Sequence, residues 1–306
     1  MIAVLFAILG LLALAYIGTW IASLRERREG TPAGGADALG WPTPGQLLIG
    51  FGTDFLDTLG IGNFATTTSL FRFSRMVPDE LIPGTLNAGH TLPVIAEAFI
   101  YIAIIEVDVA TLFLMIGAAV AGAWSGAGVV ARLPRRRIQI GMGIGLLVAA
   151  GLMLMTQLEL LPAGGDTLDL RGVRLAVGLS GSAVLGALMT LGIGFYAPCM
   201  ILVALLGMNP KAAFPIMMGA CAFLMPVASM RFVRRKRYSL RPALGLTLGG
   251  IPAVLLAAYI VKTLDLGTVR WLVIVVVVCT AIAMLRSAAV DRNGAVIGKP
   301  APAVLR

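Results

Sequence analysis

The stretch TDFLDTLGIGNFATTTS at residues 53–69 is matched further along the chain by LGALMTLGIGFYAPCMI at residues 185–201, and both contain Leu-Gly-Ile-Gly. An ungapped shift of 132 residues extends this match to 13 identities in 37 positions, among them two prolines that stay in register. Shared apolar composition does not readily produce two prolines in register. The sequence therefore indicates an internal duplication with one glycine-rich break in each copy.

The composition places the chain in lipid. Hydrophobic residues make up 58% of it and charged residues 13%, with a mean hydropathy of +0.94, which is more apolar than a water-soluble core requires. The net charge of +9 comes mostly from short basic runs between apolar segments, as in cytoplasmic loops, so no nucleic-acid partner is expected. The three cysteines lie in apolar stretches without disulfide or metal-ligand spacing and are interpreted as packing residues. No metal or cofactor is predicted.

Apolar segments of about 20 residues can cross the ~30 Å hydrocarbon core of a membrane as helices. The expected spans are 2–24, 81–105, 109–131, 138–160, 211–232, 240–262 and 268–286. Residues 2–24 have no basic n-region, so they are expected to be a retained helix and not a cleaved signal. The predicted organisation is an N-terminal helix at 1–24, a cytoplasmic linker at 25–44, one repeat at 45–160, a second at 175–286, and a cytoplasmic tail at 287–306.

Basic clusters predict the topology. By the positive-inside rule all three clusters are cytoplasmic, so each pair of neighbouring clusters must be separated by an even number of crossings. That count requires 45–74 and 175–206 to enter the membrane, break at the repeated tetrapeptide and return as re-entrant hairpins. The alternative, continuous kinked helices, stays open. With hairpins, the two repeats have inverted topology, the N-terminus is outside and the C-terminus is cytoplasmic. The clusters are Arg25, Arg27, Arg28; Arg132, Arg135, Arg136, Arg137; and Arg231, Arg234, Arg235, Lys236, Arg237, Arg241.

A glycine-rich Leu-Gly-Ile-Gly element, repeated once per half and followed by a proline before the next helix, resembles the TauE/SafE sulfite-exporter family. The resemblance covers about 45–290 and rests on Gly50, Gly60, Gly62, Gly192, Gly194 and Pro198. The first half departs from the family pattern, because Asn63 follows Gly62 and Thr66 stands where the second half has Pro198. The resemblance implies a bacterial inner-membrane carrier for sulfite, sulfoacetate or related organosulfonates, driven by the proton gradient.

Four ionisable residues are expected at membrane depth: Asp54, Asp57, His90 and Glu97. A charged side chain at a helix centre costs about 2.5–3.5 kcal/mol on insertion scales, so three carboxylates without a cationic partner are not expected to ionise together. Asn87, His90 and Glu97 share one helical face. The second repeat has none of these titratable groups, which assigns proton coupling to the first repeat, on Asp54, Asp57, Asn87, His90 and Glu97. Hydrogen bonding to a structural neighbour is the competing interpretation.

The hairpin tips are the expected anion site. Where each half-helix restarts after its break, unpaired backbone N–H groups and the positive end of the helix dipole face mid-membrane. Side-chain donors follow the first tip, although a Thr/Ser run can also join helices to each other. The predicted substrate-binding residues are Gly60, Gly62, Asn63, Thr66, Thr67, Gly192, Gly194 and Tyr196.

The sequence leaves several functions open. The first is a proton-coupled anion carrier, and the second is a cation or metal-ion transporter that uses the carboxylates and the histidine. A structural membrane subunit is a third. An enzyme is not expected, because no His-Glu-x-x-His, Gly-x-Ser-x-Gly or Gly-x-Gly-Asp element occurs. The expected partners are protons, a small anion and the bilayer, and a homodimer is compatible with the sequence.

Overall fold

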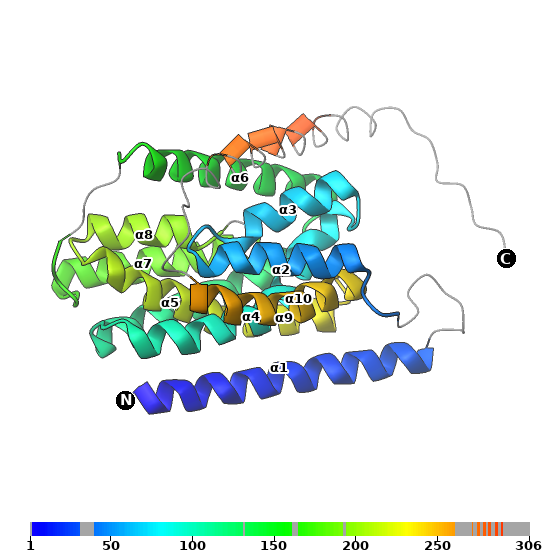
Figure 1. The fold of residues 1–306 in the computed structure, drawn as a ribbon, viewed down its shortest axis with the longest axis horizontal. Helices are drawn as coiled ribbons and strands as arrows, with labels where there is room; N and C mark the ends of the chain where they lie inside the picture. The colour runs from blue at the N-terminus through cyan, green and yellow to red at the C-terminus, as the bar shows by residue number, and fades with distance from the viewer. Residues whose placement is uncertain are drawn as a thin grey trace.

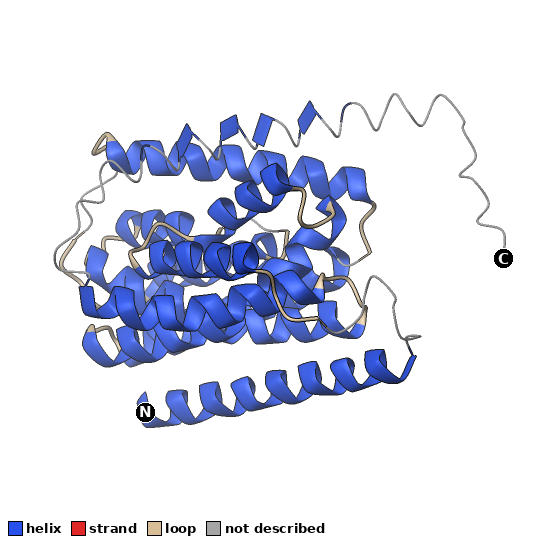
Figure 2. Ribbon diagram, turned by 45° about the vertical axis from the view of Figure 1, so that its right-hand side comes forward, coloured by secondary structure: helices blue, strands red, loops and turns tan. Residues whose placement is uncertain are grey.

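The structure is a computed structural model that describes residues 2–30, 40–130, 132–160, 165–191 and 194–260, with isolated positions between 271 and 289. Within these ranges the regular structure is helical, and no strand is present (Figure 2). The α-helices are α1 Ile2–Gly30, α2 Pro44–Thr58, α3 Asn63–Ser74, α4 Ile82–Ile104, α5 Val109–Val130, α6 Arg135–Gln157, α7 Gly172–Met189, α8 Tyr196–Leu205, α9 Ala213–Arg234 and α10 Leu240–Ile260, and two 3₁₀ turns, η1 Asp79–Leu81 and η2 Pro210–Ala212, precede α4 and α9.

Six helical segments of the described chain are long and apolar enough to cross a membrane: Ile2–Arg25, Asp79–Ile104, Val109–Gly126, Gly172–Met189, Ala213–Arg234 and Leu240–Ala258. Five of them coincide with predicted spans. The sixth, Gly172–Met189, belongs to a predicted hairpin and is by itself long enough to span. The predicted span 138–160 forms α6, which is not among the six, and 268–286 lies mostly outside the described residues. The protein is therefore an all-helical membrane protein.

Helix α1 is longer than predicted. It continues through the charged run to Gly30, so the expected linker at 25–44 starts later, because arginine and glutamate are good helix formers. α1 and α6 flank the bundle on opposite sides (Figures 1 and 2). Two buried hydrogen bonds hold α1 in place, from the Tyr16 hydroxyl to the Ala88 carbonyl at 2.6 Å and from Trp20 Nε1 to the Tyr238 hydroxyl at 3.1 Å.

The helices on both sides of the first Leu-Gly-Ile-Gly form a hairpin. α2 and α3 are separated by 59–62, and the 15 residues of α2 rise only about 22 Å, which is less than the ~30 Å hydrocarbon core. Gly60 and Gly62 adopt φ values of 81° and 90°, which L side chains rarely adopt. The chain reverses there, so that a Cβ on Gly45 would lie 3.4 Å from Met76 Cε at the other end of the hairpin.

The second break gives a second hairpin. α7 ends at Met189 and α8 begins at Tyr196. A Cβ on Gly181 would lie 2.6 Å from Leu202, and one on Gly178 would lie 3.3 Å from Leu206. In these two contacts a lower residue number on α7 pairs with a higher one on α8, so the two helices are antiparallel. Both Leu-Gly-Ile-Gly positions are therefore breaks in helices that turn back, as the sequence predicts, and continuous kinked helices are excluded for these segments.

Helices of the two halves pack across each other (Figure 1). α2 lies on α10 in parallel, with Gln46 against Gly245 and Asp54 against Gly250, and α7 lies on α5 in parallel. Helices α4 and α9 are antiparallel neighbours, joined by a 3.0 Å hydrogen bond between the Thr91 and Ser229 hydroxyls. Helix α2 of the first hairpin is thus covered by α10 of the second half, and α7 of the second hairpin by α5 of the first half.

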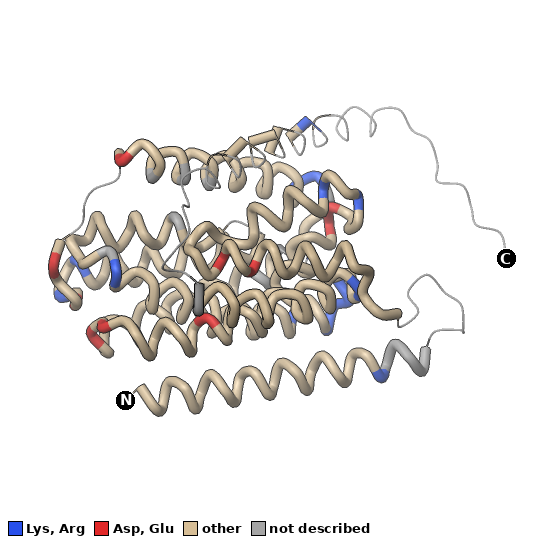
Figure 3. Tube along the Cα trace, in the orientation of Figure 1, with Lys and Arg blue, Asp and Glu red and all other residues tan. Residues whose placement is uncertain are grey.

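Charge separates along the bundle. Figure 3 shows most Lys and Arg residues at the end where α1 stops and α2 starts, and acidic residues with a smaller basic group at the opposite end. Asp108, at the acidic end, precedes α5 and accepts hydrogen bonds from the Thr111 backbone N–H at 2.8 Å and its hydroxyl at 2.9 Å. The backbone hydrogen bond is the main cause that lowers the pKa of Asp108, and it stabilises the start of α5.

Candidate functional site

A buried polar network lies at the first hairpin. Asp54 and Asp57 come from α2, and His90 and Glu97 come from the same face of α4, as their +3/+4 spacing predicts. All four side chains are buried. Among the described residues of this network, His90 is the one side chain that can carry a positive charge. An imidazolium at His90 would offset only one of three carboxylate charges in a low-dielectric interior, so ionisation of all three carboxyls at once is unfavourable here.

One branch of the network links Asp54 to the tip of the hairpin. Asp54 Oδ1 lies 2.7 Å from His90 Nδ1 and accepts a 2.9 Å hydrogen bond from Asn63 Nδ2. His90 Nε2 lies 3.0 Å from the Thr67 hydroxyl. A proton that leaves Asp54 therefore has a direct acceptor in His90, and the far imidazole nitrogen already faces a hydroxyl that can donate or accept.

The other branch joins Asp57 and Glu97. The Tyr196 hydroxyl, from the second hairpin, lies 2.9 Å from Glu97 Oε2 and 3.3 Å from Asp57 Oδ2. Thr58 donates a 2.8 Å hydrogen bond to Glu97 Oε1. One phenolic hydrogen serves two carboxyl groups here, so a proton held on either carboxyl completes the hydrogen bonding of the pair.

Asp57 also caps α3. Its Oδ1 accepts a 2.8 Å hydrogen bond from the Asn63 backbone N–H, the first residue of that helix. A carboxylate at this position meets the positive end of the helix dipole. The amide that the sequence offers to an anionic substrate therefore already binds the protein's own carboxylate.

Both hairpin tips line one small internal cavity of about 30 Å³. A water molecule needs roughly 10–15 Å³ by such a measure, so the space admits about two waters. The lining residues are Asp57, Ile61, Gly62, Asn63, Phe64, Ala65, Val94, Met189, Gly194, Phe195, Tyr196, Pro198 and Cys221. Gly62 and Gly194, at matching places in the two repeats, thus meet at the same site.

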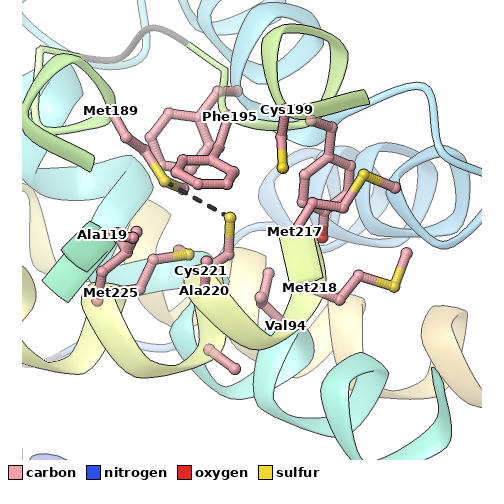
Figure 4. Packing of buried hydrophobic residues seen from close by; sticks show 14 of the residues in the cluster. Val94, Ala119, Met189, Phe195, Cys199, Met217, Met218, Ala220, Cys221 and Met225 are labelled. Atoms are coloured by element: carbon pink, nitrogen blue, oxygen red, sulfur yellow. Dashed lines mark hydrogen bonds between the residues drawn. The ribbon is translucent and has the colours of Figure 1, made fainter. Parts of the chain in front are cut away.

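The two walls of this cavity differ in chemistry. Both sides contribute apolar side chains, but the first repeat adds the carboxyl of Asp57 and the amide of Asn63, whereas the polar groups of the second are the Tyr196 hydroxyl and the Cys221 thiol. Figure 4 shows the sulfur-rich packing of that second wall, in which Cys221 Sγ lies 3.7 Å from Met189 Sδ. The ionisable carboxyl therefore lies on the side of the first repeat, and the side of the second repeat is richer in polarisable sulfur.

The structure separates the predicted residues into groups. Four of them line the cavity: Gly62, Asn63, Gly194 and Tyr196. Asp57 lines the cavity too and also belongs to the carboxyl network. Gly60 forms the turn, where an added Cβ would meet Phe214 at 3.3 Å. Gly192 lies outside the described residues.

Three predicted polar residues lie apart from the cavity lining. The Thr66 hydroxyl bonds back to the Asn63 carbonyl at 2.9 Å, and Thr67 serves His90. Asn87 stays outside the network, since its Nδ2 donates to the Pro83 carbonyl at 2.8 Å. Its position one turn before His90 brings it onto the predicted face but not into reach of the carboxyls.

Two residues of the site escape prediction from sequence. Thr58, which binds Glu97, matches Thr190 in the repeat and shares a helical face with Asp54, but neither signal assigns it a partner on α4. Gly250 of α10 makes room for Asp54, because a Cβ there would lie 2.0 Å from Asp54 Oδ2. No local pattern connects residues 54 and 250, since their contact depends on how α2 and α10 pack.

Within the described part of the chain, no group of three or more His, Cys, Asp or Glu side chains is arranged to hold a metal ion. Comparison with known proteins adds no relative: no family model matches the chain, and neither the curated proteins nor the solved structures contain a significant match.

Proposed function

We propose that the protein is a proton-coupled secondary transporter of the TauE/SafE type that moves a small anion, such as sulfite, sulfoacetate or another organosulfonate, across the bacterial inner membrane. The observation that carries the proposal is the meeting of two broken-helix tips, one from each repeat, at one cavity beside a buried carboxyl network. Broken helices that meet near mid-membrane are the usual substrate site of secondary transporters.

The helix packing supports two inverted repeats. The 132-residue shift relates α2 to α7, α4 to α9 and α5 to α10. The α2–α10 contact then has α7–α5 as its equivalent, and both are parallel, while α4 and α9 contact each other antiparallel. Equivalent contacts in both halves, together with equivalent helices that run antiparallel, are expected of a pseudo-two-fold axis in the membrane plane. In this arrangement the first hairpin opens to the cytoplasm and the second opens outside, with the N-terminus outside and the C-terminus inside.

The size of the cavity supports alternating access. Space for about two waters does not admit a sulfonate, which has at least five heavy atoms. Binding therefore requires the two tips to separate on one side while they stay closed on the other. Because none of the described residues that line the cavity is Lys or Arg, hydrogen-bond donors and helix dipoles must hold the anion, and it can leave again without breaking an ion pair.

Asp57 gives this proposal a coupling step. Its carboxylate and an anionic substrate compete for the same Asn63 N–H. When Asp57 takes up a proton, its interaction with the helix dipole weakens and the amide becomes free for the substrate. Anion and proton then enter the site together, which avoids net negative charge beside Glu97.

A cation carrier is the second candidate. The excess of carboxyl groups and the capped α3 terminus favour it, because an anion would have to displace Asp57, whereas a cation would bind the carboxylates directly. The side of the second repeat favours the anion, since its described lining residues offer a hydroxyl donor on Tyr196 but no charged ligand for a cation.

The test is flux through the purified full chain in proteoliposomes. Wild type is expected to accumulate sulfite or sulfoacetate under an imposed pH gradient. Glu97→Gln should reduce that gradient-driven uptake at least tenfold and leave counterflow exchange, since an amide keeps the shape but cannot carry the proton. Glu106→Gln, the same change at an exposed position, is the matched control and should behave as wild type. Uptake of Na⁺ or a divalent cation without anion flux would support the cation carrier instead.

A further inference from the structure

The second hairpin carries an apolar groove on its outer surface. Helices α7 and α8 line an open groove with a volume of about 630 Å³. Two of its side chains, Val184 and Leu205, are 58% and 68% exposed in the isolated chain. The lining residues are Ala176, Val177, Ser180, Gly181, Val184, Leu185, Pro198, Ile201, Leu202 and Leu205. The groove and the internal cavity have different linings, and among the described lining residues they share Pro198 alone.

The length of the groove matches one membrane leaflet. From Ala176 to Leu185 helix α7 rises about 14 Å, which is roughly half of the ~30 Å hydrocarbon core. In the re-entrant arrangement proposed above, on which this step rests, α7 enters the membrane at its N-terminal end. The outer end of the groove then lies near one headgroup region and its inner end near mid-membrane. A single acyl chain has this reach and this chemistry.

A basic side chain, Arg174, stands at the outer mouth of the groove, at the end of the bundle that also carries acidic residues. Arg174 is exposed and lies one turn before Val177, and its Nη1 would be 3.5 Å from a Cβ on Gly207, two residues past Leu205. Among the described residues no acidic side chain forms an ion pair with Arg174. Its neighbour Arg171, by contrast, is bound to Asp169 at 2.7 Å. Lys211, also exposed, follows in η2. Figure 3 shows basic residues at this end of the bundle.

We propose that the α7–α8 groove binds an anionic phospholipid, with one acyl chain between the helices and its phosphate on Arg174. A guanidinium at the interface is suited to a phosphate, because its planar donors match the phosphate oxygens. The chain end reaches Pro198, which also lines the internal cavity. The lipid therefore packs against the same short helix that bears Tyr196, and it braces the second hairpin from outside.

The experiment is native mass spectrometry of the full chain exchanged into micelles with phosphatidylglycerol or phosphatidylcholine. Wild type should retain phosphatidylglycerol in preference to phosphatidylcholine. Arg174→Gln should weaken phosphatidylglycerol retention about fivefold, the effect of one basic residue near an anionic surface. Arg132→Gln, at an exposed position on another loop, is the control and should leave retention unchanged.

A second variant tests the acyl chain separately. Val184→Trp fills the groove and should abolish retention of phosphatidylglycerol, while thermal melting verifies that the variant is folded. Equal retention by Arg174→Gln and Arg132→Gln would overturn the proposal. A lipid-free dimer that Val184→Trp dissociates would overturn it too, because a second copy would then occupy the groove.

Discussion

The hairpins α2–α3 and α7–α8 share a backbone design but not a chemistry. Both break at Leu-Gly-Ile-Gly, turn back and deliver a glycine to the same cavity. At the tips, however, Asp57 of the first corresponds to Met189 of the second, and Asn63 to Phe195. Asp57 caps α3, whereas the N-terminus of α8 has no side-chain cap. Duplication thus preserved the break and left ionisable groups in one copy only.

The division of roles is also reciprocal. Phe64 and Tyr196 occupy equivalent positions. Phe64 packs its ring beside His90, with centroids 6.2 Å apart, while Tyr196 donates its hydroxyl to the carboxyls of the first repeat. The second hairpin therefore supplies a hydroxyl to the polar network of the first repeat. Phe64, at the equivalent place in the first hairpin, has no hydroxyl to supply to the second repeat. A movement that separates the tips would break the Tyr196 hydrogen bonds and change the surroundings of both carboxyls at once.

The largest expected difference between the hairpins is the side of the membrane to which they open. In inside-out and right-side-out vesicles, a cysteine at Met76 should react with a membrane-impermeant maleimide only from the cytoplasmic face. A cysteine at Asn209, near the mouth of the second hairpin, should react only from the outside. The background variant carries serine at Cys199, Cys221 and Cys279. Labelling of both positions from the same face would refute the inverted arrangement.

The next difference concerns how each hairpin packs on its covering helix. An alanine at Gly250 would overlap the Asp54 carboxyl, 2.0 Å away, whereas an alanine at Gly186, the position equivalent to Asp54, would overlap the backbone oxygen of Ala119 at 2.1 Å. Overpacking typically costs about 1–3 kcal/mol of unfolding free energy. The cost of Gly186→Ala should lie at the upper end of this range or above it, because the Ala119 backbone oxygen cannot rotate away as the Asp54 side chain can.

Double variants separate these two clashes. Asp54→Ala removes the nearest obstacle to Gly250→Ala. The double variant should therefore lose about 1 kcal/mol less unfolding free energy than the two single variants lose in sum. Ala119→Gly leaves the backbone oxygen in place and should give Gly186→Ala no such rescue. Unfolding free energies in micelles measure both cycles. A rescue of equal size in both would contradict the packing described for α7 and α5.

Sequence reasoning succeeded where the signal is local. The glycine breaks, the shared face of His90 and Glu97 and five of the seven predicted spans depend on residues near each other in the chain, and the structure contains them. The predicted end of α1 at residue 24 is wrong, because the charged run that follows it does not end the helix. Charged side chains with long stems continue helices readily.

The finer chemistry of the site could not be predicted from local patterns. The contact between Asp54 and Gly250 joins residues of different repeats, and periodicity within one helix carries no information on it. The cap of α3 was within reach, because Asp57 precedes Asn63 by only six residues, but it required knowing that the turn places the carboxyl over the new helix. Unpaired amides are predicted at both tips, but the structure caps the first with Asp57 and leaves only the second without a side-chain cap.

The smallest difference lies in the backbone of the two tips. Gly62 has φ 90° and ψ 134°, a conformation in which a side chain is strained, whereas the φ of Gly194 is not in the positive range and nothing lies within 4 Å of a Cβ added there. Gly62→Ala should therefore lower the free energy of unfolding by about 1–3 kcal/mol, and Gly194→Ala should change it by less than about 0.5 kcal/mol. Denaturant unfolding in micelles measures both, with Gly117→Ala, another glycine with open space around it, as the control for helix propensity. Equal losses at the two tips would mean that Gly194 also needs the freedom of glycine, and the contrast between the hairpins would then be confined to their side chains.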